Sequence, residues 1–305
     1  MRKVIQRSIG GPEVLEVIET EVPEPGGTEI LVEVKAAGVN PVDWKVRSGG
    51  LGPLPFSLGW DVSGVVRALG PGVTRFAVGD AVFGMPRFPA EAGGYSEFVV
   101  APSRQFTVKP AELTHVMAAG LPLAGLTAWQ ALVHTAGLQP GQRVLIPAAA
   151  GGVGHLAVQI AKSHRAYVIA TASNIKHDFV QSLGADEVID YRTNDVASSV
   201  DRVDVCLATV PGQLNDLAQT LNPGGCVIAL NGVDAASSKK LNHAGYRSSF
   251  MLVEPDRADL DALAGLVRAG ELTVHIDKVF PLAQASEAHR YGERGRSMGK
   301  VVLVP

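Results

Sequence analysis

The segment that decides the fold reads Val144-Leu-Ile-Pro-Ala-Ala-Ala-Gly-Gly-Val-Gly-His-Leu-Ala-Val-Gln-Ile-Ala-Lys162. It joins a short apolar run to a turn of small residues and then to an amphipathic helical pattern. Small residues let the backbone turn sharply and approach a pyrophosphate, and the positive end of the following helix attracts the phosphate charge. This order of elements predicts a dinucleotide-binding turn. The residues expected to contact the dinucleotide there are Ala149, Gly151, Gly152, Val153 and Gly154.

The residues that follow the next strand favour NADPH over NADH. Chains that prefer NAD usually carry an Asp or Glu about 20 residues after the first glycine, where it binds the adenosine ribose. Thr171 stands at this distance from Gly151, and no carboxylate lies among the next few residues. Ser173 and Lys176 instead offer a hydroxyl and a cation to a 2′-phosphate. Lys176 has a plainer alternative, as a solvated residue near a helix start.

Strands and helices alternate from about residue 115, which predicts a doubly wound parallel sheet. Apolar runs predict strands at 143–147, 167–171, 187–191, 203–209 and 226–230. Helical spacing predicts helices at 152–164, 213–221 and 256–269. The fold class is therefore α/β.

The first 110 residues carry short apolar runs between turn residues, which is typical of a mostly β domain. Strand patterns return at 274–281 and 300–304, so the chain is expected to come back to its first domain. We predict a first domain of residues 1–115 completed by 271–305, and a second of residues 116–270. The segments at about 45–60 and 240–255 show no regular pattern.

Composition excludes several function classes. With 305 residues, 46% hydrophobic and 19% charged, the chain is long enough for two folded domains. A formal net charge of −3 without a basic run argues against nucleic acid as a partner. No apolar run reaches the length of a membrane span or forms a signal sequence. Cys206 and Cys226 sit in apolar strands and fit a reducing cytoplasm.

Several motifs occur in an order that resembles the quinone oxidoreductase (zeta-crystallin-like) branch of the medium-chain dehydrogenase/reductases. Besides the 148–154 turn they are Gly10-Gly-Pro-Glu-Val-Leu15, Ala36-Ala-Gly-Val-Asn-Pro-Val-Asp-Trp-Lys-Val-Arg-Ser-Gly49, Gly59-Trp-Asp-Val-Ser-Gly-Val-Val66, Val78-Gly-Asp-Ala-Val-Phe-Gly84, Leu183-Gly-Ala-Asp-Glu-Val-Ile-Asp-Tyr191 and Gly299-Lys-Val-Val-Leu303. The likeness spans essentially the whole chain. It implies a GroES-like catalytic domain, a Rossmann NADP-binding domain and a homodimer.

The resemblance also implies chemistry without zinc. The alcohol dehydrogenase branch places a zinc-binding Cys where this chain has Asn40, and a His-Glu pair where it has Trp60-Asp61. The eight histidines form no helical pair of the kind that zinc requires, and His155 is interpreted as structural. Without a Lewis acid, hydride transfer to an electron-poor double bond is easier than deprotonation of an alcohol. We therefore expect an NADPH-dependent reductase of quinones or small α,β-unsaturated carbonyls, acting on a small electrophile.

The family pattern transfers further roles to individual residues. Near the nicotinamide it places Asn40, Asp43 and Lys45, with Thr127 facing the cofactor and Asn231 at the end of a strand. Near the 2′-phosphate and adenosine ribose it places Ser173, Lys176 and Tyr191.

Two of the three catalytic candidates, Lys45 and Asp43, have an alternative interpretation. Quinone reductases often carry a Tyr where this chain has Lys45, so Lys45 is either a donor to the enolate oxygen or a surface residue. Asn40 is a candidate for orienting a carbonyl. Asp43 is alternatively a cap of the helix suggested by residues 42–47. No proton donor is identified, and solvent is the alternative source.

Two other functions remain open from the sequence. An enoyl-thioester reductase of fatty-acid or polyketide assembly shares the fold and the hydride chemistry. A non-enzymatic protein that binds NADPH, with a structural or RNA-binding role, belongs to a different class. The absence of a basic or aromatic-interleaved patch argues against RNA.

Overall fold

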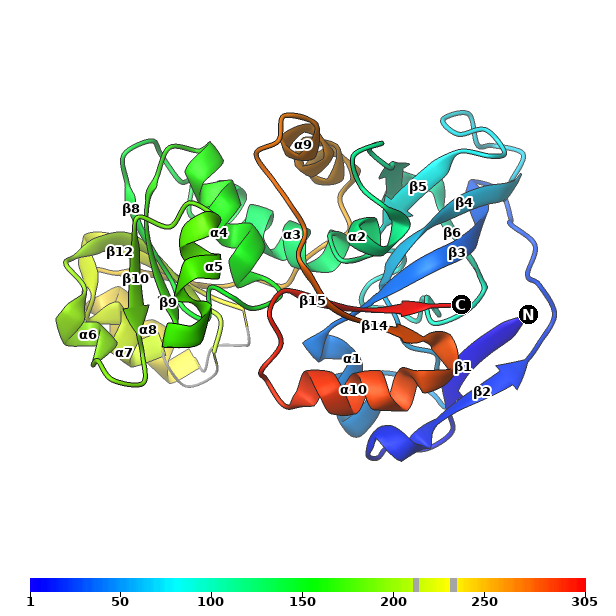
Figure 1. Ribbon diagram of the computed structural model, residues 1–305, viewed down its shortest axis with the longest axis horizontal. Coiled ribbons are helices and arrows are strands. Elements are labelled where there is room, and N and C mark those ends of the chain that lie inside the picture. Colours follow the sequence, from blue (N-terminus) through cyan, green and yellow to red (C-terminus); the bar gives the residue numbers. More distant parts are fainter. Residues whose placement is uncertain (211–213, 231–234) are drawn as a thin grey trace. The chain divides into compact units, whose positions relative to one another are not determined.

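The computed structural model describes residues 1–210, 214–230 and 235–305 (Figure 1). These residues form two compact units. Unit 1 contains Met1–Leu126, Glu254–Arg268 and Val274–Pro305, and unit 2 contains Thr127–Val253 and Ala269–Thr273. The division differs from the predicted boundaries after residues 115 and 270. Residues 116–126 and helix α9 (Arg257–Arg268) belong to unit 1, where the Thr107 hydroxyl of strand β7 donates a hydrogen bond to Asp261 of α9.

The strands of unit 1 form a large antiparallel-rich sheet and a separate hairpin. They are β1 (Arg2–Gln6), β2 (Leu15–Glu19), β3 (Glu29–Val39), β4 (Asp61–Leu69), β5 (Ala81–Gly84), β6 (Phe98–Pro102), β7 (Phe106–Val108), β14 (Ile276–Pro281) and β15 (Lys300–Val304). The large sheet has the order β14-β15-β3-β4-β5-β7, with β6 also paired to β3, and β1 pairs with β2. The last strand, β15, thus lies beside β3 from the first part of the sequence (Figure 1). Val301 of β15 pairs with Val39 of β3.

Helices and short 3₁₀ turns connect the strands of unit 1. They are α1 (Pro41–Gly49), α2 (His115–Ala119), the first part of α3 (Pro122–Trp129), α9 and α10 (Ala285–Glu293), with short 3₁₀ turns at Pro12–Val14, Ser103–Gln105 and Leu282–Gln284. Residues 127–129 of α3 belong to unit 2. Helix α1 begins directly after β3 because Asn40 keeps an extended backbone and Pro41 fits the first helical turn. A small apolar core of Ala36, Ala119 and Val302 joins α2 to strands β3 and β15.

Unit 2 contains a six-stranded parallel sheet of the order β10-β9-β8-β11-β12-β13. Its strands are β8 (Arg143–Ile146), β9 (Tyr167–Ala172), β10 (Glu187–Asp190), β11 (Val203–Ala208), β12 (Leu221–Ala229) and β13 (Arg247–Phe250). The central strands are buried apolar runs, as a sheet covered on both faces requires. Leu145, Cys206 and Val227 lie in one core cluster that spans three neighbouring strands. The predicted doubly wound fold is confirmed.

The helices of unit 2 connect these strands. They are a π-helical turn at Gln130–Thr135 that continues α3, then α4 (Gly154–Ser163), a 3₁₀ turn at Asn174–Lys176, α5 (His177–Ser182), α6 (Val196–Ser199), α7 (Leu214–Ala218) and α8 (Ala235–His243). The end of helix α8 and strand β13 lie in the segment at about 240–255, for which the sequence showed no regular pattern. Strand β13 forms because its backbone pairs with β12 from Cys226 to Ala229, whereas its own side chains show no apolar alternation.

Candidate active site and dinucleotide-binding turn

The turn between β8 and α4 is anchored on the neighbouring strand β9. The N–H of Ala149 donates to the carbonyl of Thr171 at 2.9 Å, and the N–H of Ala148 donates to the Thr171 hydroxyl at 3.3 Å. Ala148 adopts a φ of +48°, a left-handed conformation that is uncommon for a residue with a Cβ. The chain therefore reverses direction within a few residues of the end of β8.

Gly154 lets α4 start directly against this turn. A Cβ at position 154 would lie 2.5 Å from the carbonyl oxygen of Ala148 and 2.7 Å from the Cα of Ala149. The first N–H groups of a helix have no acceptor within the helix, and they carry the positive end of its dipole. Gly151, Gly152 and Val153, which precede α4, are all partly exposed. The backbone here thus suits the pyrophosphate of a dinucleotide.

His155, on the first turn of α4, is fully buried. Its Nδ1–H donates to the carbonyl of Gly151 at 2.8 Å. This hydrogen bond from a buried side chain stabilises the turn, which agrees with a structural role for His155.

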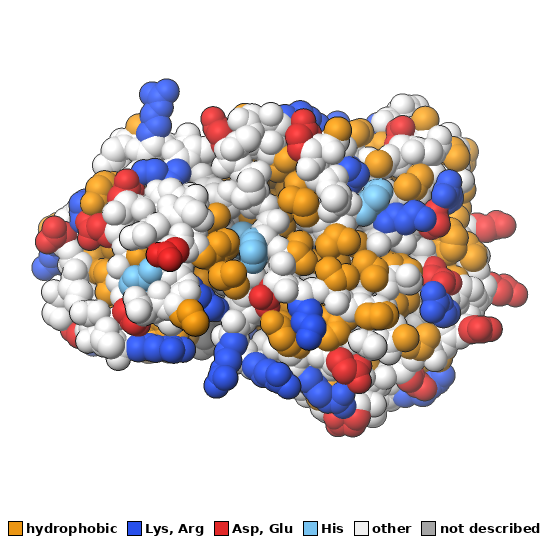
Figure 2. All heavy atoms as spheres, viewed as in Figure 1, with side chains coloured by type: hydrophobic (Ala, Val, Ile, Leu, Met, Phe, Trp, Pro, Cys, Tyr) orange, Lys and Arg blue, Asp and Glu red, His pale blue; other side chains and the backbone are white. Residues whose placement is uncertain are grey.

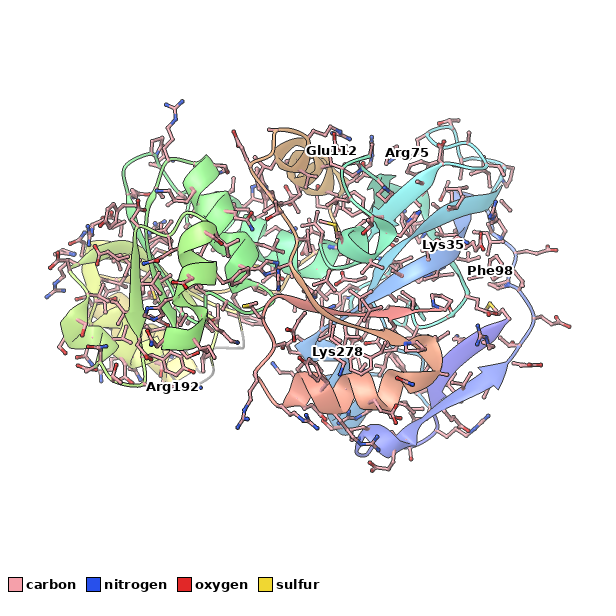
Figure 3. All side chains as sticks on the ribbon, in the orientation of Figure 1. Lys35, Arg75, Phe98, Glu112, Arg192 and Lys278 are labelled. Atoms are coloured by element: carbon pink, nitrogen blue, oxygen red, sulfur yellow. The ribbon has the colours of Figure 1, made fainter. Side chains whose placement is uncertain are left out.

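The residues predicted for the adenosine end lie just beyond β9 and β10. Ser173 is buried, and its carbonyl accepts the N–H of Lys176 at 2.8 Å. Lys176 is half-buried, whereas Tyr191 is 50% exposed and lies 5.9 Å from the guanidinium of Arg192, which is labelled in Figure 3. Two strand ends thus bring these candidates to one edge of the sheet.

Asp190, the last residue of β10, has no predicted role from the sequence. Asp190 is in register with Ala172 at the end of β9. One carboxylate oxygen accepts the N–H of Asn174 at 3.1 Å and the other accepts the N–H of Arg192 at 3.0 Å. A carboxylate does therefore lie beside the Ser173 turn, but both oxygens are used to hold the backbone. Asp190 lies within the predicted strand 187–191, and a carboxylate near the end of that strand was the only available signal.

Two further cofactor candidates lie on other elements. Thr127 is buried, with 8% of its surface exposed, on α3. Asn231, which follows the end of β12, lies outside the residues that the structure describes.

The catalytic candidates Asn40 and Asp43 belong to a buried polar cluster in unit 1. Asn40 is the N-cap of α1, and its backbone N–H donates to the Asp43 carboxylate at 2.7 Å. The other Asp43 oxygen accepts the N–H of Gly59 at 3.1 Å. Asp43 therefore does stabilise the start of α1, from the third helical position, while Asn40 occupies the cap.

Asp61 and Lys300 complete this cluster around the Asn40 side chain. The Asn40 amide donates to Asp61 Oδ2 at 2.8 Å, and the Lys300 ammonium donates to Asn40 Oδ1. Lys300 Nζ also lies 3.5 Å from Asp61 Oδ2, and the other Asp61 oxygen accepts the N–H of Leu123 at 2.6 Å. The exposed fractions of Asn40, Asp61 and Lys300 are 1%, 0% and 3%. Burial raises the pKa of Asp61, and the Lys300 charge opposes that rise.

A directed chain of hydrogen bonds reaches Asp43 from the other side. Arg47 donates to Nδ1 of His289 at 3.1 Å, so the imidazole nitrogen Nε2 is the one that carries hydrogen toward the Tyr95 hydroxyl at 3.3 Å. Tyr95 in turn bonds the Asp43 carboxylate. Arg47 also pairs with Glu293 at 2.6 Å.

Burial shifts the pKa values of the groups in this series of hydrogen bonds. It raises the pKa of Asp43 to about 7, and the Asp61 charge adds to that rise. It lowers the pKa of His289 to about 3, with the Arg47 charge acting in the same direction, and raises the pKa of Tyr95 well above its usual value. His289 is consequently neutral at physiological pH, whereas Asp43 titrates near it.

Lys45, the third catalytic candidate, is exposed on α1 and lies outside this buried cluster. The sequence identified Asn40 and Asp43, yet it gave no role to Lys300, Tyr95, His289 or Arg47. Lys300 is the first residue of an apolar strand in the motif Gly299-Lys-Val-Val-Leu303. A charged residue at a strand position that is expected to be buried was the one feature of the sequence that indicated a role for it.

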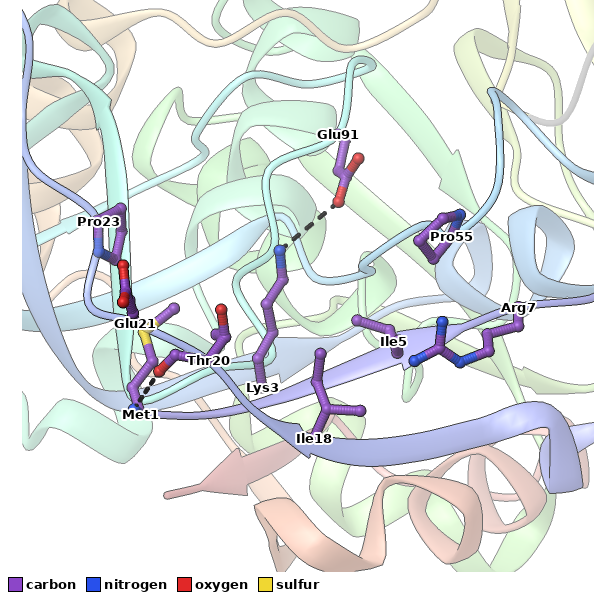
Figure 4. A pocket seen from close by; sticks show the side chains of 10 residues that line it. All are labelled: Met1, Lys3, Ile5, Arg7, Ile18, Thr20, Glu21, Pro23, Pro55 and Glu91. Carbon is purple, nitrogen blue, oxygen red and sulfur yellow. Dashed lines mark hydrogen bonds and ion pairs between the residues drawn. The ribbon is translucent and has the colours of Figure 1, made fainter.

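A cavity of about 360 Å³ lies elsewhere in unit 1, against strands β1 and β2 (Figure 4). Lys3 and Glu91 face each other across it at 3.7 Å. None of the predicted site residues that the structure describes lines this cavity. Figure 2 shows acidic and basic side chains interspersed over one face of the molecule. Among the described helices, none has the length and apolar character needed to cross a membrane.

Two family models match the chain. The model described as alcohol dehydrogenase GroES-like domain matches residues 26–111, and the one described as zinc-binding dehydrogenase matches residues 183–303. The chloroplast envelope quinone oxidoreductase homolog of Arabidopsis thaliana is 35% identical over 97% of this chain and 95% of its own length. The chloroplastic NADPH-dependent alkenal/one oxidoreductase of the same plant is 32% identical over 100% of this chain and 80% of its own.

The solved structures agree. The quinone oxidoreductase from Coxiella burnetii superposes with a TM-score of 0.94 and 34% identity, covering 100% of this chain and 99% of that one. This chain belongs to the medium-chain dehydrogenase/reductase family, in its quinone oxidoreductase branch. Units 1 and 2 are accordingly its GroES-like and Rossmann domains, and the chain is an oxidoreductase.

The zinc in the second family description does not fit the residues present. Within residues 1–210, 214–230 and 235–305, no group of three or more His, Cys, Asp or Glu side chains is arranged to hold a metal ion. At the positions expected for zinc ligands, the Asn40 amide and the Asp61 carboxylate bond each other and a lysine. The Trp60 indole donates to the carbonyl of Ala90 at 2.8 Å.

Proposed function

We propose that this enzyme transfers hydride from NADPH to the electron-poor double bond of a quinone or a small α,β-unsaturated carbonyl, without a metal. The observation that carries the proposal is the Asn40–Asp61–Lys300 cluster. Asn40 and Asp61 stand at positions where the alcohol dehydrogenase branch holds zinc, and both are bonded to each other and to Lys300. A carbonyl conjugated to a double bond is activated by its own electronics, so its reduction needs mainly orientation and charge stabilisation.

The residues of unit 2 bind and orient the cofactor in this proposal. NADPH, when bound, supplies the hydride. The 148–154 turn and the start of α4 hold its pyrophosphate, and Ser173, with Lys176, receives its 2′-phosphate. Thr127, Tyr191 and Asn231 are proposed to line the rest of the dinucleotide.

The residues of unit 1 act on the acceptor. Hydride adds to the β-carbon of an enone, the electron pair of the double bond moves onto the carbonyl oxygen, and a proton then adds at the α-carbon. The Asn40 amide has two N–H groups, of which one is bonded to Asp61. We assign the other to the substrate carbonyl. Solvent supplies the proton, and Lys45, which is exposed on α1 outside the buried cluster, is the alternative donor.

The relatives support this reaction more than the alternatives that the sequence left open. Their names specify a quinone oxidoreductase and an NADPH-dependent alkenal/one oxidoreductase. An enoyl-thioester reductase and a non-enzymatic NADPH-binding protein have less support.

The test is steady-state oxidation of NADPH with a quinone, a 2-alkenal and an enoyl thioester, each at matched concentration. We expect turnover with the quinone or the alkenal, and at least tenfold lower kcat/KM with the thioester. The reverse assay, a simple primary alcohol with NADP⁺, should give negligible turnover. Rapid use of the thioester alone would assign the enzyme to acyl assembly instead, and NADPH that stays reduced with every acceptor would favour the binding-only role.

A homodimer is part of the proposal. Strand β13 ends the parallel sheet of unit 2, and Phe250 on it is 53% exposed. An exposed edge strand presents unpaired backbone groups to a second chain. Sedimentation of the purified protein should give twice the chain mass, and a single species at the chain mass would contradict it.

We also propose a cytoplasmic location, because both cysteines are buried with free thiols. Fractionation of the native host with an antibody to the protein tests this, and recovery in a membrane or secreted fraction would contradict it.

A further inference from the structure

Lys300 is a buried cation at the start of strand β15. Only 3% of its surface is exposed, and lysine is almost never buried to this degree without partners. Its ammonium donates to the side-chain oxygen of Asn40 and lies 3.5 Å from Asp61 Oδ2. The residues it contacts come from β4 and from the cap of α1, so one side chain joins three separate parts of unit 1.

The two charges around Asn40 fix the orientation of its amide. Lys300 requires an acceptor and therefore faces Oδ1, while Asp61 requires a donor and faces Nδ2 at 2.8 Å. Rotating the amide by half a turn would place NH₂ against the ammonium and the oxygen against the carboxylate. Both contacts would then be repulsive in a buried site, where charges are weakly screened. Only one orientation of Asn40 is compatible with this pair.

Asp61 cannot hold Asn40 in place by itself. Its other oxygen is bonded to the N–H of Leu123, and burial raises its pKa. A carboxyl without the Lys300 charge would more readily take up a proton, and a protonated carboxyl can donate as well as accept. Either amide orientation would then find a partner.

We propose that Lys300 is a positioning residue for hydride transfer, which acts by fixing the Asn40 amide in the orientation that presents one N–H to the substrate carbonyl. This inference rests on the proposed function, in which Asn40 orients that carbonyl. It predicts that the effect of Lys300 on turnover passes through Asn40. A lysine that only stabilised the fold would not show this dependence.

A double-mutant cycle tests the dependence. The variants are Lys300→Met, Asn40→Ser and the two combined; serine retains the ability to cap α1. With the quinone or alkenal that the wild type reduces, we expect Lys300→Met alone to lower kcat at least tenfold. In the Asn40→Ser background, we expect the same change to lower kcat less than twofold. The Kd of NADPH, measured by fluorescence, should stay within twofold in all variants.

Two control variants separate charge from structure. Lys278→Met alters an exposed lysine on the neighbouring strand β14, labelled in Figure 3, and should leave kcat unchanged. Lys300→Arg keeps the charge and should retain more turnover than Lys300→Met. If Lys300→Met does not fold, Lys300→Met with Asp61→Asn removes both buried charges together. The amide introduced by Asp61→Asn can pair with either orientation of the Asn40 amide, so kcat should still fall at least fivefold.

The outcomes decide between positioning and plain stability. The inference would be overturned if Lys300→Met lowered kcat by the same factor in the wild type and in the Asn40→Ser background. It would also be overturned if Lys300→Met alone left kcat unchanged, or if the double variant Lys300→Met with Asp61→Asn kept the kcat of the wild type. Wild-type turnover of the acceptor is measured first. A failure there would refute the proposed function, whereas turnover that Lys300→Met does not change refutes only the role of Lys300.

Discussion

The turn at residues 148–154 and the buried cluster around Asn40 are built by opposite means. The turn is made of backbone: Ala148 and Ala149 bond to Thr171, and Gly154 leaves room for the helix that follows. The cluster is made of side chains: Asn40, Asp61 and Lys300 satisfy one another in the interior of unit 1. The turn requires that Gly154 has no side chain, whereas the cluster requires the charged side chains of Asp61 and Lys300.

This difference determines how each region should respond to mutation. A backbone site fails when atoms are added, because a close-packed turn cannot move aside. A buried charged cluster fails when one partner is removed, since the remaining charge keeps its desolvation cost without compensation.

The largest expected effect is that of Asp61→Asn. The change leaves the Lys300 ammonium buried without an opposite charge, which should lower the free energy of unfolding by about 3–5 kcal/mol. Urea denaturation followed by circular dichroism measures the loss. The control is Glu33→Gln, which removes the surface ion pairs of Glu33 with Arg67 and Lys35 in the same sheet and should cost about 1 kcal/mol or less. Equal losses in the two variants would show that the Asp61–Lys300 pair contributes no more than a surface pair.

The second effect is a change in pH dependence from Asp43→Asn. Asp43 has a usual pKa of 3.8 and a folded pKa of about 7. Between these values the folded chain holds a proton that the unfolded chain has lost, so the Asp43 contribution to stability falls as pH rises and is lost above about pH 7. The amide of the variant cannot titrate. Relative to the wild type, the variant should gain stability from pH 4 to 7, by up to about 4 kcal/mol.

His289 contributes a slope of the opposite sign. Its pKa falls from 6.5 to about 3 on folding, so between these values the unfolded chain binds the extra proton and stability rises with pH. His289→Gln, which can still accept from Arg47 and donate to Tyr95, should remove that rise. Chemical denaturation at half-unit pH steps compares both variants with the wild type. Parallel curves for all three proteins would mean that neither group titrates as expected in the fold.

The contrast also explains what the sequence could predict. The predicted strand 143–147 and helix 152–164 correspond to β8 at 143–146 and α4 at 154–163. A local pattern sufficed because a strand, a turn and a helix are encoded by neighbouring residues. Asn40 and Asp43 were also predicted, through the family pattern rather than through their contacts.

The rest depends on contacts between distant residues. Lys300 bonds Asn40 across 260 positions, and His289 meets Arg47 across 242. No spacing rule reaches that far, because such pairs are brought together only by the pairing of β15 with β3 and the packing of α10. Strand β13 also could not be predicted from local sequence, because it forms by pairing with β12 although its own residues are mostly polar.

A smaller effect is expected from Gly154→Ala. The added Cβ would overlap the backbone of Ala148 and Ala149, at a cost of about 1–3 kcal/mol, shared between stability and NADPH binding. Fluorescence titration should show at least tenfold weaker NADPH binding. In the control Gly265→Ala on α9, the Cβ meets no described atom within 4 Å, and stability should be unchanged or higher. Undiminished NADPH affinity in Gly154→Ala would show that the turn can adapt.

The smallest effect should come from Ser173→Ala, which probes one side chain beside the backbone turn. Ser173 is buried at the end of β9, and we expect its hydroxyl to bind the 2′-phosphate that distinguishes NADPH from NADH. Its loss should weaken NADPH binding about tenfold, or about 1.4 kcal/mol, and leave NADH affinity within twofold. Ser182→Ala removes an exposed hydroxyl on α5, bonded to Phe179, and should change the affinity for neither cofactor. Equal weakening of NADPH and NADH by Ser173→Ala would instead mean that the hydroxyl supports the backbone turn and does not bind the 2′-phosphate.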